Sequence, residues 1–359
     1  MSPEHLDRPL ASAAAEECQR QGLLLLEQRQ ISLAADKFDE ALALGWDPLE
    51  GLAQRWVSWM FLGEFERAWG ETDRIESRRH KGFPVKGQLV WDGRDFTNRV
   101  VLLRNDHGLG DTIQFIRYAP LIRERCRRLI VKARPVLLPL LRTFECIDDV
   151  IPAAGPDPLF DLEIECTELP YIFRTTVDTI PRDIPYIRIN GAAARNSSRG
   201  GGRLRVGLVW ASGPWNDRRS LQLTDLRPLS TIPHVSFRSL QWGPEWIQAQ
   251  NPGHGLVIRN TSAAVREDLI ETAAAIMRCN VVLTVDTMVA HLAGALAKPV
   301  WVLLHVDSDW RWMLDRQDSP WYPTMKLFRQ RSRADWSAPI GEATEELRQL
   351  ALRFRRGDQ

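Results

Sequence analysis

The chain has 359 residues, of which 44% are hydrophobic and 26% charged, a profile typical of a globular protein with roughly two or three domains. Its formal net charge is +1, with 47 basic against 46 acidic residues, so charge gives no support for nucleic-acid binding. The five cysteines show no CxxC spacing, and no apolar run is long enough to span a bilayer, which argues against a disulfide framework and a transmembrane segment.

Residues 11–77 read as helical throughout, and a period of 34 residues relates Ala34 to Ala68. With Phe38 and Pro48, this pattern resembles the tetratricopeptide repeat. About two helical hairpins fit, fewer than the roughly three repeats that usually stand alone, so we expect the segment 1–77 to dock on the domain that follows. It is either a binding surface for a protein partner or a structural cap.

The next part of the chain, 78–190, reads as a parallel α/β unit that follows a connector at 78–98. Helical stretches alternate with short apolar strands, which are expected at 99–105, 128–133, 148–151 and 160–165. This alternation predicts a parallel sheet with right-handed crossovers. The Gly-rich stretch 191–203 then reads as a linker.

A second α/β unit is expected over 204–359. Its predicted strands lie at 205–211, 235–240, 256–259, 281–285 and 300–304, and an amphipathic helix is expected at 342–355. In parallel sheets of this kind, ligands bind beyond the carboxyl ends of the strands. The turns that follow these strands are therefore the places to look for a site.

The turn after the first predicted strand contains His107, Gly108, Gly110 and Asp111. Its glycines allow a ligand to approach the backbone, and the helix that begins near Asp111 offers N–H donors. The turn is not a GxGxxG fingerprint, which disfavours a dinucleotide-dependent epimerase or dehydrogenase. Asp111 is either a general base or the cap of its own helix.

Two turns of the second unit carry polar side chains. Ser212, Arg219 and Ser220 follow the strand 205–211, and a hydroxyl and a guanidinium there suit a phosphate, although Arg219 reads equally well as a surface charge. Gln241 follows the strand 235–240, where it either contacts a base or ribose or belongs to a plain β-turn.

The segment 281–299 is the most informative one, because a buried strand ends at Asp286-Thr287 and an Ala-rich helix follows. The positive end of such a helix binds phosphate through its first N–H groups, and Asp286 suits sugar hydroxyls. His291 lies one turn into the helix, where it is either a ligand contact or a packed core residue. Asp307 and Asp309 lack the companions of a metal site, and we predict none.

Five stretches together resemble the motifs of bacterial tetratricopeptide-repeat glycosyltransferases, relatives of the ADP-heptose:lipopolysaccharide heptosyltransferases of glycosyltransferase family nine. The stretches are 108–121, 206–211, 216–220, 284–296 and 309–323, and the resemblance covers about residues 15–345. It implies a GT-B fold, with two Rossmann-like, doubly wound α/β lobes facing a cleft after a short all-α tetratricopeptide-like segment. A final helix would cross back from the second lobe.

The resemblance also implies a metal-independent, inverting sugar transfer without a cofactor. The donor would be a nucleotide-diphosphate sugar on the C-terminal lobe, and the acceptor a hydroxyl of a glycan, lipopolysaccharide or protein. Asp111 matches the family's proposed base. His107, Gly108, Gly110 and Gln114 would form the acceptor side, and the donor side would be formed by Ser212, Arg219, Ser220, Gln241, Asp286, Thr287, Met288 and His291.

Two expectations complete the sequence-based picture. The N-terminus lacks a signal peptide pattern, so we expect a cytoplasmic protein, with peripheral attachment to the inner membrane left open. Residues 211–215 read Ala-Ser-Gly-Pro-Trp, where relatives often carry Gly-Asn-Pro-x-His. This difference motivates an alternative function, a catalytically degenerate adaptor that binds a protein partner through residues 11–77.

Overall fold

The computed structural model describes residues 12–46, 48–80, 91–189, 202–213, 216–259 and 267–357. The chain divides into two compact units, the first made of Met1–Leu89, Pro170–Ile180 and Asp309–Asp315, and the second made of Val90–Leu169, Pro181–Ser308 and Arg316–Gln359. Most of the predicted linker 191–203 lies outside the described residues.

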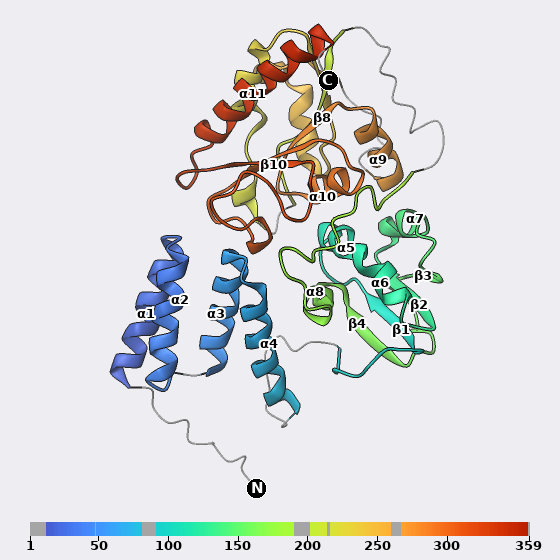
Figure 1. Ribbon diagram of the computed structural model, residues 1–359. Helices are drawn as coiled ribbons and strands as arrows, with labels where there is room; N and C mark the ends of the chain where they lie inside the picture. Colours follow the sequence, from blue (N-terminus) through green and yellow to red (C-terminus); the bar gives the residue numbers. More distant parts are fainter. Residues whose placement is uncertain are drawn as a thin grey trace. The chain divides into compact units, whose positions relative to one another are not determined.

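The first unit is built on four consecutive helices, each packed on the next (Figure 1). They are α1 (Ala13–Glu27), α2 (Ile31–Ala43), α3 (Pro48–Leu62) and α4 (Phe65–His80). Gly22 permits close packing of α1 on α2, because a Cβ atom there would lie 2.4 Å from Cε1 of Phe38. Ala34 and Ala68, which the 34-residue period relates, are both fully buried. The tetratricopeptide assignment itself stays a prediction.

Two later segments complete the core of this helical unit. The indole N–H of Trp69 donates to the main-chain oxygen of Thr175 at 2.7 Å. The ring of Trp310 packs edge-on against Trp56 and Phe65, with both centroid distances 6.0 Å. The compact unit therefore extends beyond the segment 1–77 that the sequence delimits.

The second unit contains two parallel sheets. In the first, the strands β1 (Val100–Arg104), β2 (Arg128–Ala133), β3 (Asp149–Pro152) and β4 (Leu162–Glu165) are ordered β3-β2-β1-β4. Its connections carry the short helices α5 (Leu109–Phe115), α6 (Ala119–Arg123) and α7 (Leu138–Leu141), and α8 (Leu169–Ile172) follows β4. All four strands lie where the sequence predicts them, within three residues at each end.

The second sheet is ordered β10-β9-β8-β5-β6-β7 and is also parallel throughout. Its strands are β5 (Leu204–Val209), β6 (Val235–Ser239), β7 (Ile258–Arg259), β8 (Val281–Val285), β9 (Val300–Leu304) and β10 (Met325–Arg329). This is the Rossmann strand order, in which the direction of winding reverses between β5 and β8. In the first sheet the corresponding reversal lies between β1 and β4. The sequence-based prediction omitted β10.

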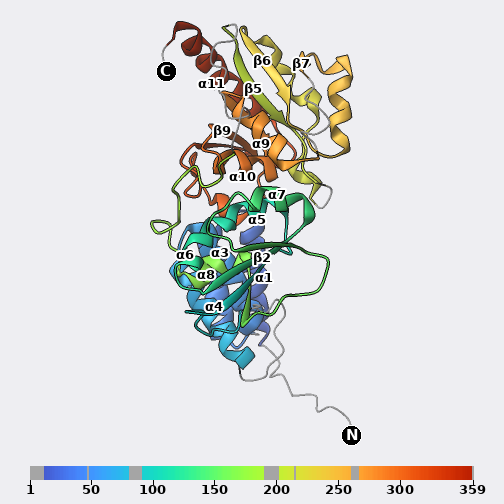
Figure 2. The ribbon, with the colours of Figure 1, turned by 90° about the vertical axis from the view of Figure 1, so that its right-hand side faces the viewer.

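Three helices cover the second sheet: α9 (Leu269–Met277), α10 (Met288–Ala295) and α11 (Ser337–Arg356). The predicted final helix at 342–355 is confirmed within α11, which begins earlier. Ile340, Ala343, Leu347 and Ala351 recur at helical spacing and bury one face of α11 in the core beneath β5 (Figure 2). The crossing of this helix to the first lobe stays a prediction. None of the described helices combines the length and apolar character that a membrane span requires.

Candidate functional site

The two turns at the winding reversal of the second sheet lie side by side. One follows β5 and the other follows β8, and these two strands pair directly. The guanidinium of Arg219 lies 3.6 Å from Oδ2 of Asp286, and both side chains are largely buried. The tertiary structure therefore brings together two donor-side residues that the sequence predicted separately, at the edge where ligands bind in such sheets.

The hydroxyl groups of Ser212 and Ser220 brace the turn after β5. The main-chain N–H of Ser212 donates to Oγ of Ser220 at 3.0 Å, and the two hydroxyl oxygens lie 3.2 Å apart. Oγ of Ser212 also donates to the main-chain oxygen of Asn216 at 3.0 Å. These contacts join the two ends of the turn, in which Ser220 directly follows Arg219.

The amide oxygen and nitrogen of the Gln241 side chain both form their hydrogen bonds with main-chain groups. Its side-chain oxygen accepts from the N–H groups of Trp210 and Ala211 at 2.9 and 3.0 Å. Its side-chain nitrogen donates to the carbonyls of Ala211 and Trp242 at 2.9 and 2.6 Å. A ligand would have to displace one of these bonds, so the donor-binding role of Gln241 stays a prediction while its structural role in the turn is plain.

The start of α10 keeps its first N–H groups away from a side-chain cap. Thr287 is the N-cap residue, yet its hydroxyl makes no capping bond to the helix and instead lies 3.1 Å from that of Thr284. Met288 opens the helix, and Asp286 directly before it is 4% exposed. The positive end of α10 and its N–H groups suit an anion.

In the first sheet, Asp111 makes the capping contact that the sequence left open. Its Oδ2 accepts the N–H of Gly108 at 3.0 Å, across the first turn of α5. The role of Asp111 as a general base stays a prediction. His107 is exposed, and its Nε2 lies 3.9 Å from Oε1 of Glu165.

The acceptor-side and donor-side turns meet where α5 packs on α10. A Cβ atom at Gly110 would lie 2.8 Å from Cδ2 of His291 and 3.6 Å from Cα of Met288, so only glycine permits this approach. Gln114 lies one helical turn after Gly110 and is fully buried. Neither polar atom of its side chain has a hydrogen-bond partner among the described residues.

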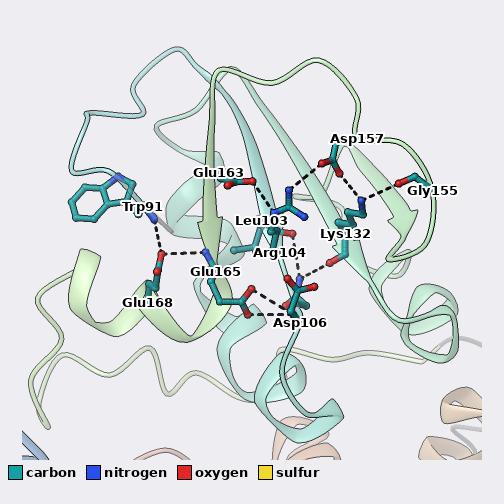
Figure 3. Close-up of polar contacts among 11 residues, drawn as sticks. Trp91, Leu103, Arg104, Asp106, Lys132, Gly155, Asp157, Glu163, Glu165 and Glu168 are labelled. Atoms are coloured by element: carbon teal, nitrogen blue, oxygen red, sulfur yellow. Dashed lines mark hydrogen bonds and ion pairs between the residues drawn. The ribbon is translucent and has the colours of Figure 1, made fainter. Parts of the chain in front are cut away.

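Sequence reasoning missed Glu165, which ends β4 beside β1 at the winding reversal of the first sheet (Figure 3). Both carboxylate oxygens lie 3.4 Å from the main-chain N–H of Asp106, and the thiol of Cys166 lies 3.3 Å from Oε1. Burial raises the pKa of Glu165 to about 7. The signal was present, because a carboxylate that ends a predicted strand is the same pattern that drew attention to Asp286.

The basic side chains at this edge of the first sheet are paired with carboxylates. Arg104 donates to Glu163 at 2.7 Å and to Asp157 at 3.0 Å (Figure 3). Lys132, on the neighbouring strand, pairs with Asp157 and donates to the main-chain oxygen of Gly155 at 3.2 Å. Arg219, on the second sheet, also has a carboxylate partner, since its guanidinium lies 3.6 Å from Oδ2 of Asp286.

Sequence reasoning also missed Tyr322 and Tyr186. Tyr322 lies within the stretch 309–323 that carries the resemblance, but no local pattern assigns it a partner. In the structure its hydroxyl lies 3.0 Å from Nδ1 of His291.

Among the described residues, no group of three or more His, Cys, Asp or Glu side chains is arranged to hold a metal ion.

Comparison with solved structures shows the fold. The chain is similar to ADP-heptose lipopolysaccharide heptosyltransferase II of E. coli, with a TM-score of 0.50 and 13% identity over 70% of this chain and 98% of that one. It is similar to the glycosyltransferase family 9 protein of Veillonella parvula, with a TM-score of 0.51 and 12% identity over 74% and 99%. The fold is therefore of the GT-B type, a helical segment followed by two Rossmann-like α/β sheets.

One curated relative matches in sequence. Protein FlbA of Caulobacter vibrioides is 25% identical over 300 residues, which are 75% of this chain and 49% of FlbA. The chain thus spans about half the length of that relative. No protein-family model matches the sequence.

Proposed function

We propose that the chain is a metal-independent, inverting glycosyltransferase that moves a sugar from a nucleotide-diphosphate sugar to a hydroxyl of a glycan, lipopolysaccharide or protein. One observation carries the proposal. At the winding reversal of a Rossmann-ordered sheet, the largely buried Arg219 side chain and the start of α10 lie together, and α10 packs on the Gly110 turn of the other sheet. The GT-B fold supports the same reading.

In this proposal, residues that follow strands of the second sheet bind the sugar donor. Negative charge builds on the nucleotide diphosphate as it departs, and a guanidinium with a helix N-terminus stabilises that charge without a metal ion. Arg219 supplies the guanidinium, the N–H groups at Thr287 and Met288 supply the helix end, and Ser212 and Ser220 add hydroxyls. Asp286 accepts hydrogen bonds from sugar hydroxyls. No resident cofactor is needed.

The first sheet handles the acceptor. Asp111 takes the proton of the attacking hydroxyl, while the bond from the N–H of Gly108 holds its carboxylate at the start of α5. His107, Gly108, Gly110 and Gln114 line the acceptor side. A protein acceptor could be recruited through the helices at residues 11–77, and we place the reaction in the cytoplasm or at the inner face of the inner membrane.

Nucleotide binding provides the first test. ADP-, UDP-, GDP- and CMP-sugars are screened for an increase in unfolding temperature, and we expect one nucleotide to raise it by several degrees at about 100 times its Kd. Arg219→Ala should abolish that increase. Arg218→Ala is the matched control, because the neighbouring Arg218 side chain is 72% exposed and should leave binding intact.

Asp111→Asn tests the base separately from binding. The Asn side-chain oxygen still accepts the N–H of Gly108, so the helix cap is kept while the proton acceptor is lost. We expect the nucleotide-induced stabilisation to remain and sugar transfer or donor hydrolysis to fall by roughly 100-fold or more. Turnover that survives this change would remove Asp111 from the mechanism.

A second candidate function is a non-catalytic adaptor with a GT-B body. Ser212, Ser220 and Gln241 favour it, because these side chains, which we predicted to bind the sugar donor, instead form hydrogen bonds within the protein. If none of the four nucleotide sugars changes the unfolding temperature, the adaptor function becomes the better-supported hypothesis. Partner binding by the helices of the first unit would then be the property to measure.

A further inference from the structure

One buried arginine bonds to three segments of the second unit. Arg117 lies in the short helical turn directly after α5, and only 4% of the residue is exposed. Its Nε donates to the main-chain oxygen of Gln114 at 2.7 Å, and its Nη1 donates to those of Trp321 at 2.6 Å and Pro181 at 3.2 Å. Its Nη2 donates to the hydroxyl of Tyr186 at 3.1 Å.

The charge of Arg117 is buried among neutral groups. Its hydrogen-bond partners in the described part of the chain are main-chain oxygens and a hydroxyl, with no carboxylate among them. The central carbon of the guanidinium also lies 4.5, 4.8 and 5.5 Å from the ring centroids of Tyr322, Tyr186 and Trp321. A guanidinium stays charged, and a buried charge is costly unless its bonds are made, so the segments that supply these contacts are held to Arg117.

These segments come from both sheets and from the chain between them. Gln114 lies in α5, on the side of the first sheet. Pro181 and Tyr186 lie between β4 and β5, on the path from the first sheet to the second, and Trp321 lies between β9 and β10. The planar fork of Arg117 reaches all three in fixed directions, which the single ammonium of a lysine on its flexible stem does not.

Two of the aromatic residues around the guanidinium also contact α10. The main-chain N–H of Tyr186 donates to the main-chain oxygen of Ala295, the last residue of α10, at 3.2 Å. The hydroxyl of Tyr322 lies 3.0 Å from Nδ1 of His291, in the middle of the same helix. Arg117 is therefore connected to α10 by two routes, one to the end of the helix and one to its middle.

The first turns of α5 and α10 carry the acceptor-side and donor-side residues, and they meet where a Cβ atom at Gly110 would lie 2.8 Å from Cδ2 of His291. We propose that Arg117 is a positioning residue. By joining the C-terminal end of α5 to α10, it fixes the carboxylate of Asp111 relative to a donor at the start of α10. A misplacement of about 1 Å can cost roughly 100-fold in rate. The effect on Asp111 rests on the proposed function, whereas the joint between the two helices does not.

The experiment compares Arg117→Lys, which keeps the charge but removes the fork, with the unmodified protein. The assay is hydrolysis of the nucleotide sugar that stabilises the unmodified protein most, and calorimetric binding of that sugar gives the folded, active fraction. We expect the donor Kd to stay within about threefold and kcat to fall roughly 30-fold. Arg123→Lys is the matched control, because Arg123 pairs with Asp148 at 3.0 Å, and it should leave both values unchanged.

The same change in Asp111→Asn separates positioning from a loss of structure. If Arg117 acts through the base, Arg117→Lys should lower kcat by less than about threefold once that base is absent, because residues that act as a unit are not additive. An equal loss in both backgrounds overturns the positioning role.

Tyr186→Phe provides a milder variant if Arg117→Lys does not fold. It keeps the ring over the guanidinium and removes the hydroxyl that accepts from Arg117 and donates to the main-chain oxygen of Ile113. We expect kcat to fall roughly three- to tenfold, and again only where Asp111 is present. An unchanged kcat in both Arg117→Lys and Tyr186→Phe also overturns the positioning role.

Hydrogen exchange tests the joint without a nucleotide sugar. In Arg117→Lys, amide exchange should become roughly tenfold faster in α5 and α10 and stay unchanged in α11. Unchanged exchange in α5 and α10, or an equal rise in α11, refutes the joint whatever the activity. Faster exchange in α5 and α10 alone, in a protein that no nucleotide sugar stabilises, supports the joint and counts against the proposed function.

Discussion

The ionisation of one buried side chain, Glu165, makes the stability of the fold depend on pH. Its folded-state pKa of about 7 lies above the ordinary value of 4.5, so the folded protein holds this proton more tightly than the unfolded chain does. The resulting contribution to stability is therefore complete below about pH 4.5 and is lost as the pH rises through about 7. Above that pH, the fold must carry a desolvated carboxylate beside the Gly108 turn.

We expect Glu165→Gln to remove this pH dependence. Between pH 5 and pH 8.5, the free energy of unfolding of the unmodified protein should fall by up to roughly 3 kcal/mol more than that of the variant, as urea denaturation measures. Glu124→Gln, at an exposed position, is the control and should leave the difference unchanged. Parallel pH profiles for Glu165→Gln and the unmodified protein would contradict the raised pKa.

At the scale of elements, α10 is the helix on which the two sheets of the second unit meet. Its N-terminal half contacts Gly110 of α5, and its C-terminal half packs on Tyr322. A Cβ atom at Gly294 would lie 2.4 Å from Cδ1 of Tyr322, so the ring can sit there only because the helix has a glycine. Gly110 of α5 and Gly294 of α10 thus permit the two close contacts of α10.

Gly294→Ala should therefore destabilise the protein by about 1–3 kcal/mol in urea denaturation, because a fully buried ring must move to admit the methyl group. Gly70→Ala is the matched control, a helical glycine with nothing within 4 Å of its added Cβ, and it should stabilise by about 0.5–1 kcal/mol. Equal effects of the two changes would show that Tyr322 is not held against α10.

For the whole molecule, the helical unit and the later chain are interleaved. Residues 170–180 and 309–315 belong to the first compact unit, where Tyr171 and Arg174 bond to Asp73 of α4 and Trp310 packs on Trp56. A cut at residue 77 would consequently divide one hydrophobic core between two pieces.

We expect a variant that begins at residue 78 to be largely insoluble, or to bind a hydrophobic dye and lose cooperative unfolding, since its share of that core is exposed. A variant that begins at Ser12 keeps α1–α4 with their contacts and should behave as the unmodified chain does. If residues 78–359 unfold cooperatively without dye binding, the later segments do not depend on the helices.

Much of the fold could be predicted from local pattern. β1 and β8 are short runs of mostly apolar residues that end at turn residues, and β2 to β4 mix apolar with charged residues but alternate with helical stretches, a pattern that is visible in a single sequence. β10 (Met325–Arg329) has a similar mixture of charged and apolar residues and was missed, and it is its parallel pairing with β9 that identifies it as a strand. The strand predicted at 256–259 is only Ile258–Arg259 in the structure, because only these two residues pair with β6.

Local sequence patterns also predicted only part of the candidate site. Local spacing singled out Asp111, Arg219, Asp286 and His291, because each belongs to a strand-to-helix turn. It gave no sign that the Gln241 side chain would bond to the main chain at Trp210 and Ala211, or that the hydroxyl of Tyr322 would lie beside the His291 ring. These contacts join residues that lie more than 25 positions apart in the chain.

The amino-acid sequence by itself determined the order of helices and strands and the chemistry of each turn, because hydrophobic periodicity and turn residues act over a few neighbouring positions. The tertiary structure alone decided that the turns after β5 and β8 adjoin, that Gly110 meets His291, and that the hydroxyl of Tyr322 lies beside the His291 ring. The reason is that strand order and helix packing are set by burial of the whole core, and burial joins residues that no local pattern relates.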